Sequence, residues 1–484
     1  MVKINRRQFI ALGAAGVGTA LVGHWLGQET ISSQPLPSSS ASAFGVYQSR
    51  DGLLELDIIA KENPVNLAGR QAYLLTYNGQ VPAPRLEAQP GDKVRLHFTN
   101  NLSQPTNIHY HGLHIPVTGN ADNVFLHIKP GEKLTYEFQI PPNHPAGTFW
   151  YHPHLHGLVA EQLFGGLAGL FIVRGQLDEI PEVKAAKEEF LVLQDFAVDN
   201  NGRLINSAHM SLMMGREGDI ITANGQVNPS LSLPEQRLLR LRILNASPSR
   251  FYRLSLENHS FYQIATDGGA LNEPIEVNEL LLIPGQRAEV LIKGDRQPGQ
   301  YRLLNLPYDR GGMGMMGGGM MGRNNRDEPI VLVTISYEDQ GQSLSIPTQL
   351  ASISALPEPQ TVRSFELNHG MNPAVGMAFL INGEAYNHDR LDTQVQLDTV
   401  EDWEITNTGM MDHPFHVHNN AFQVISRNGQ PESLLAWRDT VLVPRGETVR
   451  IRIPFRDFTG KTVYHCHVLD HEDLGMMGNL MINA

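Results

Sequence analysis

The chain has 484 residues, and at about 150 residues per domain this length predicts roughly three domains rather than one small core. Its 37 Lys and Arg against 50 Asp and Glu give a formal net charge of −13, which excludes nucleic acid as an expected partner because a phosphate backbone would be repelled. The 45 Gly and 30 Pro favour short strands and turns, and the one cysteine, Cys466, excludes an intramolecular disulfide or a CxxC-type site.

Residues 1–43 are predicted to be a signal and a flexible leader. Arg6 and Arg7 precede a moderately apolar run that is too short and too rich in Gly for a membrane span. The paired arginines resemble a twin-arginine signal, which exports folded proteins. We therefore expect export to the periplasm or an equivalent compartment by the twin-arginine machinery, with no stable membrane span after processing. The alternative is a disordered leader that anchors nothing.

From about residue 44 the sequence repeats a Pro/Gly turn followed by a strand with alternating polarity. The first clear example is Pro90-Gly91-Asp92 before residues 93–98. Similar segments recur at 130–138, 284–290 and 444–450. A phrase of the type Asn-Gly-Gln/Glu also recurs, at 78–80, 224–226 and 382–384. This repetition predicts an all-β fold built from three duplicated β-sandwich domains.

Two stretches interrupt this rhythm and mark the expected domain boundaries. One is the charged stretch 176–189, and the other is the Ser-, Pro- and Gln-rich stretch 341–360. The predicted domains are therefore 44–175, 188–340 and 358–484.

Histidines are concentrated in the first and third predicted domains, which hold 14 of the 20 within residues 109–156 and 413–471. Eight of them form His-x-His pairs: His109/His111, His152/His154, His416/His418 and His465/His467. Side chains at i and i+2 of a strand leave the same face, so each pair directs two imidazoles to one place. A lone strand histidine is usually a core or surface residue, but four pairs predict metal binding. Zinc fits poorly, because eight imidazoles exceed one tetrahedral site.

Cys466 stands between the two histidines of the last pair and must point to the opposite face of its strand. His413 lies upstream, His471 follows five residues later, and Met476 follows after five more. Two His, one thiolate and a weak axial thioether are the ligands of blue, type 1 copper. The alternative for Met476 is ordinary packing, because Met fills gaps readily. The eight paired imidazoles divide as two, three and three, which is enough for three further copper ions.

A Met- and Gly-rich loop at 311–322 closes the second predicted domain. Thioethers are soft ligands that suit Cu(I), whereas low-complexity disorder is the alternative. Two further candidates directly precede His413. The residues expected to handle Cu(I) are Met313, Met315, Met316, Met320, Met321, Met411 and Asp412.

Together these residues resemble the multicopper oxidase family over essentially all of the mature chain. The motifs that carry the resemblance are His109-Tyr110-His111-Gly112, Trp150-Tyr151-His152-Pro153-His154, His413-Pro414-Phe415-His416-Val417-His418 and the segment from His465 to Met476. The resemblance implies three cupredoxin-like Greek-key β-sandwiches, with a copper cluster between the first and third. It is close to bacterial laccase-like and cuprous oxidases, except that their Met-rich insert belongs to the third domain.

The resemblance also implies which residues bind each copper ion. The type 1 ligands would be His413, Cys466, His471 and Met476. The type 2 ion would take His109 and His416. One type 3 ion would take His111, His152 and His467, and the other would take His154, His418 and His465. Asp122 and Glu472 would supply protons, although as bland alternatives they are a loop turn residue and a solvated charge.

The expected activity is the one-electron oxidation of Cu(I), phenols or aromatic amines, coupled to the four-electron reduction of O₂ to water. Electrons would pass from Cys466 to the cluster through His465 and His467. A copper-sequestering protein for copper tolerance, with incidental oxidase activity, is the alternative. A relative that has lost catalysis is a third hypothesis, but such relatives lack ligands and no ligand position is vacant in this sequence.

Overall fold

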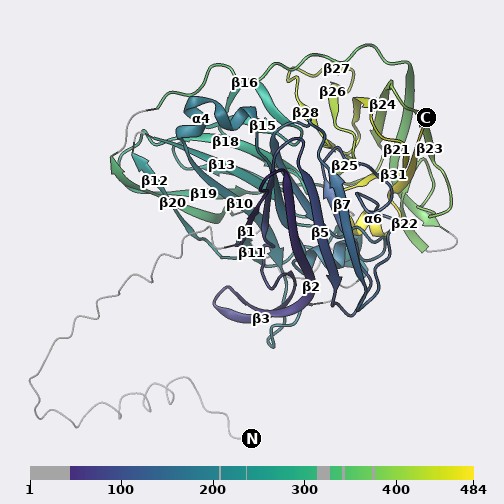
Figure 1. Cartoon of the computed structure of the whole chain (residues 1–484), viewed down its shortest axis with the longest axis horizontal. Helices are drawn as coiled ribbons and strands as arrows, with labels where there is room; N and C mark the ends of the chain where they lie inside the picture. The colour runs from purple at the N-terminus through teal and green to yellow at the C-terminus, as the bar shows by residue number, and fades with distance from the viewer. Residues whose placement is uncertain (1–43, 206–208, 236, 313–327, 341–343, 373–375) are drawn as a thin grey trace, which may run out of the picture. The chain divides into compact units, whose positions relative to one another are not determined.

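The computed structural model describes residues 44–484 except 206–208, 236, 313–327, 341–343 and 373–375. The predicted signal and leader, and the five methionines expected in the Met/Gly-rich loop, therefore lie outside the described residues. Most of the described elements are strands (Figure 1), so the predicted all-β fold is confirmed. Within the described ranges, no helix is long and apolar enough to span a membrane.

The first pair of sheets lies within residues 44–175. Its strands are β1 (Val46–Gln48), β2 (Leu53–Leu67), β3 (Arg70–Tyr77), β4 (Arg85–Ala88), β5 (Lys93–Asn100), β6 (His109–His111), β7 (Lys133–Gln139), β8 (Gly147–His152) and β9 (Gly169–Val173). They form sheets with the orders β1-β4-β9-β8-β6 and β3-β2-β5-β7. Strand β5 alternates as predicted, since Val94, Leu96 and Phe98 point into the core between the sheets. The short helix α2 (Val159–Phe164) connects β8 to β9.

Two short helices, α3 (Gln176–Glu179) and α4 (Pro181–Ala185), occupy the charged stretch before the second pair of sheets. The elements of this pair are β10 (Lys187–Phe196), α5 (His209–Met214), β11 (Ile220–Ala223), β12 (Ser230–Glu235), β13 (Leu238–Asn245), β14 (Tyr252–Leu256), β15 (Phe261–Thr266), β16 (Gly269–Val277), β17 (Leu280–Leu282), β18 (Arg287–Lys293), β19 (Gln300–Leu306) and β20 (Ile330–Gln340). The sheet orders are β11-β10-β13-β18-β15-β16 and β12-β20-β19-β14-β17.

The third pair contains both strands that carry the histidine-rich motifs of the C-terminal region. Its elements are β21 (Thr361–Asn372), β22 (Gly376–Ile381), β23 (Thr393–Gln396), β24 (Thr399–Asn407), β25 (His413–Val417), β26 (Phe422–Arg427), β27 (Gln430–Pro431), β28 (Trp437–Arg438), β29 (Thr440–Val443), β30 (Thr448–Phe455), β31 (Gly460–Cys466), α6 (Leu469–Asp473) and β32 (Met477–Asn483). One sheet has the order β22-β21-β24-β30-β26-β27, with β28 beside β26, and the other has the order β23-β32-β31-β25-β29.

The three pairs pack against one another, and residues 44–484 belong to one compact unit. In Figure 1 the purple and blue strands of the first pair lie against the teal strands of the second and the yellow-green strands of the third. The hydroxyl of Thr148 donates to Glu289 at 2.8 Å, and that of Thr266 donates to the Trp437 carbonyl at 2.7 Å. The His114 ring bonds the Asn419 carbonyl at 2.8 Å. Each pair of sheets therefore forms hydrogen bonds with both others. The three pairs, with their connecting segments, are called the first, second and third domains below.

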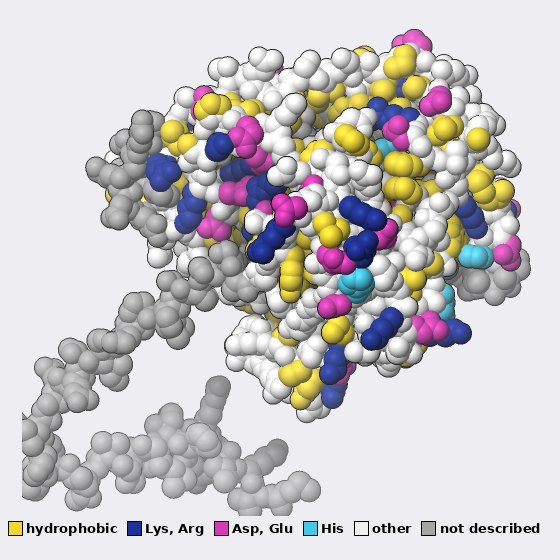
Figure 2. Space-filling view, in the orientation of Figure 1, with side chains coloured by type: hydrophobic (Ala, Val, Ile, Leu, Met, Phe, Trp, Pro, Cys, Tyr) yellow, Lys and Arg dark blue, Asp and Glu magenta, His cyan; other side chains and the backbone are white. Residues whose placement is uncertain are grey.

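The surface carries charges of both signs. On the face in Figure 2, Lys and Arg side chains lie among Asp and Glu side chains, and histidines cover only a small area. The histidines predicted to bind metal are instead buried: His109, His111, His152, His154, His413, His416, His418, His465, His467 and His471 are at most 2% exposed.

Candidate metal centre

Strands β25 and β31 are antiparallel neighbours, with Phe415 opposite Cys466 and His416 opposite His465. On one side of this pair, the Sγ atom of Cys466 lies 3.4 Å from Nδ1 of His413 and 3.8 Å from Nδ1 of His471. The two Nδ1 atoms are 3.3 Å apart. All three side chains are fully buried. Strands β25 and β31 supply His413 and Cys466, and the short helix α6 supplies His471. Together they bring the thiol and both imidazoles into the one site that the spacing predicted.

Burial alone would keep this thiol protonated, because desolvation raises the pKa of Cys466. A bound cation reverses that effect, because a coordinating thiol is deprotonated. The segment through α6 returns Met476 to the same place. Its N–H donates to the His471 carbonyl at 2.9 Å, and its own carbonyl accepts from the N–H of Cys466 at 3.0 Å. Met476 is buried beside the site, and the Phe379 ring stacks on the His471 ring at 3.7 Å.

The paired histidines lie close together on the opposite face of the β25–β31 strand pair, between the first and third pairs of sheets. Their ligand atoms fall into groups within 4.8 Å of one another: His109, His111 and His416; His111, His152 and His467; and His154, His418 and His465. In the last group, Nε2 of His465 lies 3.0 Å from Nε2 of both His154 and His418. Each group combines histidines from sequence positions about 300 residues apart.

The imidazoles of this cluster are oriented by the nitrogen that faces away from it. Nδ1 of His109 bonds the Asp122 carboxylate at 2.9 Å, Nδ1 of His152 bonds the Pro153 carbonyl at 2.9 Å, and Nδ1 of His416 bonds the Asp439 carbonyl at 2.8 Å. The Nε2 atoms of these three histidines have no hydrogen-bond partner among the described residues. Such outer contacts fix the tautomer and direct the free nitrogen toward a metal.

The imidazole nitrogens and the cysteine sulfur gathered at these two sites are chemically suited to bind copper. Burial lowers the pKa of His152 to about 3 and that of His465 to about 3, so both rings are neutral and keep a lone pair. The Nε2 atoms of His109, His152 and His416 are buried without a hydrogen-bond partner among the described residues, which is costly, and a cation relieves that cost. Imidazoles suit copper, and the thiolate set suits a blue copper ion.

Sequence comparison with known families settles what class of protein carries this site. Family models described as multicopper oxidase match residues 59–178, 186–316 and 356–484. The chain belongs to the multicopper oxidase family. It is similar to the multicopper oxidase mco of Staphylococcus haemolyticus, with 32% identity over 84% of this chain and 83% of the relative.

Solved structures of multicopper oxidases have the same fold. One is a multicopper oxidase from Campylobacter jejuni described as a metallo-oxidase, with 33% identity, a TM-score of 0.81 and coverage of 91% of this chain and 94% of that chain. Another is a laccase-like multicopper oxidase of Ochrobactrum sp., active on lignin model compounds, with 27% identity, a TM-score of 0.78 and coverage of 92% and 100%. The predicted cupredoxin-like sandwich fold and oxidase class are thus confirmed.

Both carboxyl groups expected to serve this oxidase are buried. Asp122 accepts hydrogen bonds from the His109 ring and from the backbone N–H of Tyr110 at 2.9 Å each, and burial raises its pKa to about 8. Glu472 is fully buried, and Oε1 lies 3.1 Å from Nδ1 of His156. Burial also raises the pKa of Glu472 to about 8. The alternative that Glu472 is a solvated charge is therefore wrong.

Sequence reasoning missed Asp439 of the third domain, which contacts two cluster histidines. Its Oδ1 atom accepts from Nε2 of His111 at 3.0 Å, and its backbone carbonyl accepts from Nδ1 of His416 at 2.8 Å. In the sequence Asp439 is an ordinary charged residue directly before the apolar strand β29, and only the structure shows that it is 2% exposed.

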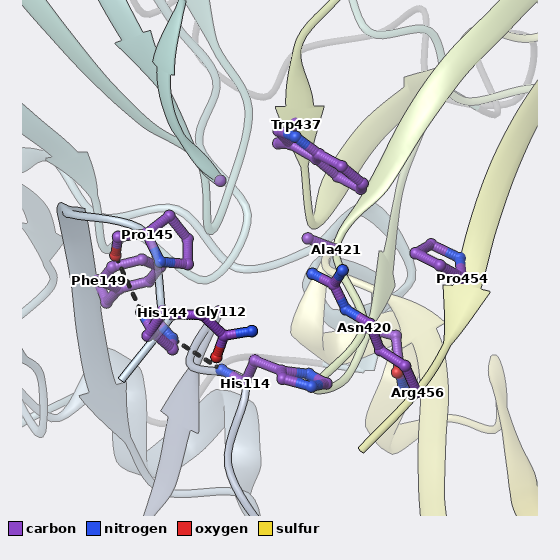
Figure 3. Close-up of a pocket in the computed structure, with 12 residues that line it drawn as sticks. Gly112, His114, His144, Pro145, Phe149, Asn420, Ala421, Trp437, Pro454 and Arg456 are labelled. Atoms are coloured by element: carbon purple, nitrogen blue, oxygen red, sulfur yellow. Dashed lines mark hydrogen bonds between the residues drawn. The ribbon is translucent and has the colours of Figure 1, made fainter. Parts of the chain in front are cut away.

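A pocket of about 190 Å³ lies where the three domains meet. Figure 3 shows Gly112 and His114 of the first domain facing Asn420 and Trp437 of the third. Gly268 of the second domain completes the junction. Gly112, which lines this pocket, directly follows His111 in the sequence.

The Met/Gly-rich loop leaves the second domain beside the Cys466 site. Gly311 pairs with Met411 as an antiparallel bridge, two residues before His413. The Asp412 carboxylate accepts from the Tyr308 hydroxyl at 2.8 Å and from the backbone N–H of Arg445 at 2.9 Å. Met411 is 4% exposed. The methionines 313, 315, 316, 320 and 321 lie outside the described residues, but the point where their loop begins is fixed near the predicted type 1 ligands.

Proposed function

We propose that this multicopper oxidase couples one-electron oxidation of Cu(I), phenols and aromatic amines to the four-electron reduction of O₂ to water, using four copper ions. The observation that carries the proposal is the division of one tripeptide between two ligand groups. The Cys466 side chain meets His413 and His471, whereas the His465 ring meets His154 and His418.

The proposed ligand roles follow from this division and from family membership. The type 1 ion takes His413, Cys466, His471 and Met476. The type 2 ion takes His109 and His416. One type 3 ion takes His111, His152 and His467, and the other takes His154, His418 and His465. Bound copper would supply one-electron redox chemistry, and four ions together would hold the electrons needed to reduce O₂ to water.

The chain itself links the two ligand groups. Peptide bonds join Cys466 to His465 and His467, which gives electrons a short covalent route from the type 1 group to the cluster. Asp122 holds the His109 ring from one side of the cluster, and Glu472 lies beside His156 on another. We assign both carboxyl groups to proton supply, because each is a buried acid at the edge of a ligand group.

Two observations support Cu(I) as a donor. The bridge between Gly311 and Met411 places the start of the methionine loop next to His413, and thioethers are ligands that prefer Cu(I). The Campylobacter jejuni relative is described as a metallo-oxidase. The laccase-like relative from Ochrobactrum supports phenolic donors as well.

Arg6 and Arg7 support export through the twin-arginine machinery to the periplasm or an equivalent compartment. There, oxidation of Cu(I) would serve copper homeostasis. The paired arginines also suit a protein that binds its copper and folds before it crosses the membrane.

The test is to load the purified protein with copper and to measure its metal content, its blue absorption and its O₂ uptake with Cu(I) or a phenol. We expect four copper ions per chain, an intense blue colour and O₂ consumption with both donors. Saturation at one or two ions without O₂ consumption would instead favour a copper-sequestering protein.

A further inference from the structure

The second domain supplies none of the proposed copper ligands, yet one of its turns reaches the cluster. This turn, residues 283–286, joins β17 to β18 and carries Gly285, and Arg287 follows it as the first residue of β18. Arg287 is fully buried, although a guanidinium is almost never buried without a specific partner.

Arg287 contacts all three domains. Its Nε atom donates to the Thr148 carbonyl of the first domain at 2.9 Å. Its Nη1 and Nη2 atoms donate to the two carboxylate oxygens of Asp439 in the third domain, at 2.9 and 2.5 Å. Nη2 also donates to the Asp267 carbonyl of its own domain at 3.0 Å. This bidentate pair fixes the plane of the Asp439 carboxylate as a single contact would not.

Asp439, whose carboxylate is held in this way, forms hydrogen bonds to two histidines of the cluster. One carboxylate oxygen receives both the Arg287 guanidinium and the Nε2–H of His111, which lies 3.0 Å away. The Thr440 hydroxyl donates to the same oxygen at 2.9 Å. The Asp439 carbonyl holds Nδ1 of His416. Asp439 therefore orients one proposed type 3 ligand through its side chain and one proposed type 2 ligand through its backbone.

Gly285 brings the same turn against a third ligand. Its φ of +84° suits glycine, and a Cβ atom placed on it would lie 2.8 Å from Cε1 and Nε2 of His467. The backbone of the second domain thus forms one wall of the space that the His467 ring occupies.

We infer that Arg287 is a positioning residue for the trinuclear copper site, acting through Asp439 on His111 and His416. The inference rests on the copper roles proposed above. Without the guanidinium, the Asp439 carboxylate would be left buried beside two imidazoles with its main cationic partner removed. It would no longer hold the tautomer and tilt of His111, and metal affinity depends on such outer contacts.

The test compares the full-length, copper-loaded protein with its Arg287→Met and Arg287→Lys variants. Copper content, the electron paramagnetic resonance of type 2 copper, the blue absorption and the rate of anaerobic bleaching by a phenol are measured. We expect Arg287→Met to hold copper at the trinuclear site about 10- to 100-fold less tightly, so that the copper content falls, and to change the type 2 resonance, with blue absorption and bleaching preserved. Arg287→Lys keeps the positive charge but cannot donate two parallel hydrogen bonds to the Asp439 carboxylate. We therefore expect a type 2 spectrum between those of the wild type and of Arg287→Met.

Arg240→Met is the matched control. Arg240 is 3% exposed in the same domain and binds Glu289 at 2.5 Å and Asp178 at 2.6 Å, so its loss removes a buried guanidinium away from the ligands. We expect lower thermal stability with an unchanged type 2 spectrum. If Arg287→Met does not fold, the copper content and type 2 resonance of Arg287→Lys test the inference.

Three results would overturn the inference. The first is a native type 2 spectrum and full copper content in the Arg287 variants. The second is an equal spectral change in Arg240→Met, which would show a general effect of destabilisation. The third is a wild-type protein without type 2 copper, which would also overturn the copper assignment and is distinguished because it appears before any substitution is made.

Discussion

Cys466 and His465 are adjacent in sequence but belong to different ligand groups. The Cys466 sulfur lies 3.4 Å from Nδ1 of His413, whereas Nε2 of His465 lies 3.0 Å from Nε2 of His154 in the first domain. Alternation along strand β31 produces this separation. The backbone between the two residues therefore joins the proposed type 1 ligand group to the proposed trinuclear group.

Replacing Cys466 with Ser tests this arrangement. We expect the variant to lose the blue absorption and all oxidation of Cu(I) and phenols, because a hydroxyl does not replace the soft thiolate. The cluster imidazoles are untouched, so about three copper ions should remain, as the proposed ligand division requires. Copper analysis and O₂ uptake measure both effects. Retained turnover would contradict the role of Cys466 in electron entry.

Replacing Gly285 with Ala tests the close approach of the second-domain backbone to the His467 ring. The new methyl group would meet the His467 ring at 2.8 Å, closer than real Cβ contacts allow, and the residue would be strained at positive φ. We expect impaired binding of the type 3 pair, with the blue absorption kept. Gly446→Ala is the control, because that glycine has a similar φ of +75° and open space around its Cβ position. An equal loss of type 3 copper in both variants would contradict the prediction.

The sequence predicted the all-β fold well because alternating strands and the turns between them are local patterns. The assignment of histidines to individual copper ions came from the family resemblance and stays a prediction. The Pro/Gly turns before 133–139 and 287–293 precede strands β7 and β18. The His-x-His spacing fixed which imidazoles share a face, and the odd position of Cys466 separated it from its neighbours.

Sequence alone could not predict contacts between residues that are distant along the chain. Arg287 and Asp439 are 152 positions apart and come from different domains, so no periodicity connects them. Each reads as an ordinary charged residue at the edge of an apolar strand. Only packing of the second domain against the third shows that the pair is buried beside His111. The entry of the methionine loop beside Met411 was hidden for the same reason.

Deleting residues 312–322 tests the methionine loop. Because Gly311 pairs with Met411 near His413, we expect the loop to serve soft metal ions at the type 1 site more than small aromatic molecules. Oxidation of Cu(I) should fall by about tenfold or more, the loss expected for about 1.4 kcal/mol of binding, while phenol oxidation should change little. Parallel O₂-uptake assays measure the ratio. Equal losses for the two donors would contradict a specific role in Cu(I) oxidation.

Replacing Glu472 with Gln tests proton supply. The amide keeps the size of the side chain but cannot release a proton, so we expect turnover to fall by about 10²-fold, the scale of general acid–base catalysis. Anaerobic reduction of the type 1 colour should be unchanged, because Cys466 is not altered. Glu401→Gln is a suitable control, since Glu401 is 3% exposed in the same domain and pairs with Arg363 away from the copper ligands. Normal turnover in Glu472→Gln would contradict the assignment.

The lowered pKa of Glu188 allows a prediction of how the stability of the second domain depends on pH. Burial disfavours its charge, but Arg242 at 2.7 Å and Arg174 at 2.9 Å outweigh burial and lower the pKa of Glu188 to about 2. A carboxyl group with a lowered folded-state pKa stabilises the protein above its unfolded pKa of about 4.5, and this contribution disappears as the pH falls toward 2. The lowered pKa corresponds to about 3 kcal/mol at neutral pH.

Glu188→Gln should therefore lower the thermal unfolding midpoint of the apoprotein strongly at pH 7 and less than half as strongly at pH 3. Calorimetry of both proteins at the two pH values measures the difference. Glu179→Gln is the control, because the side chain of Glu179 is 69% exposed and its ion pair with Lys184 contributes little in solvent. A destabilisation by Glu188→Gln that is equally large at pH 3 would show that the ionised carboxylate is not what stabilises this cluster of arginines.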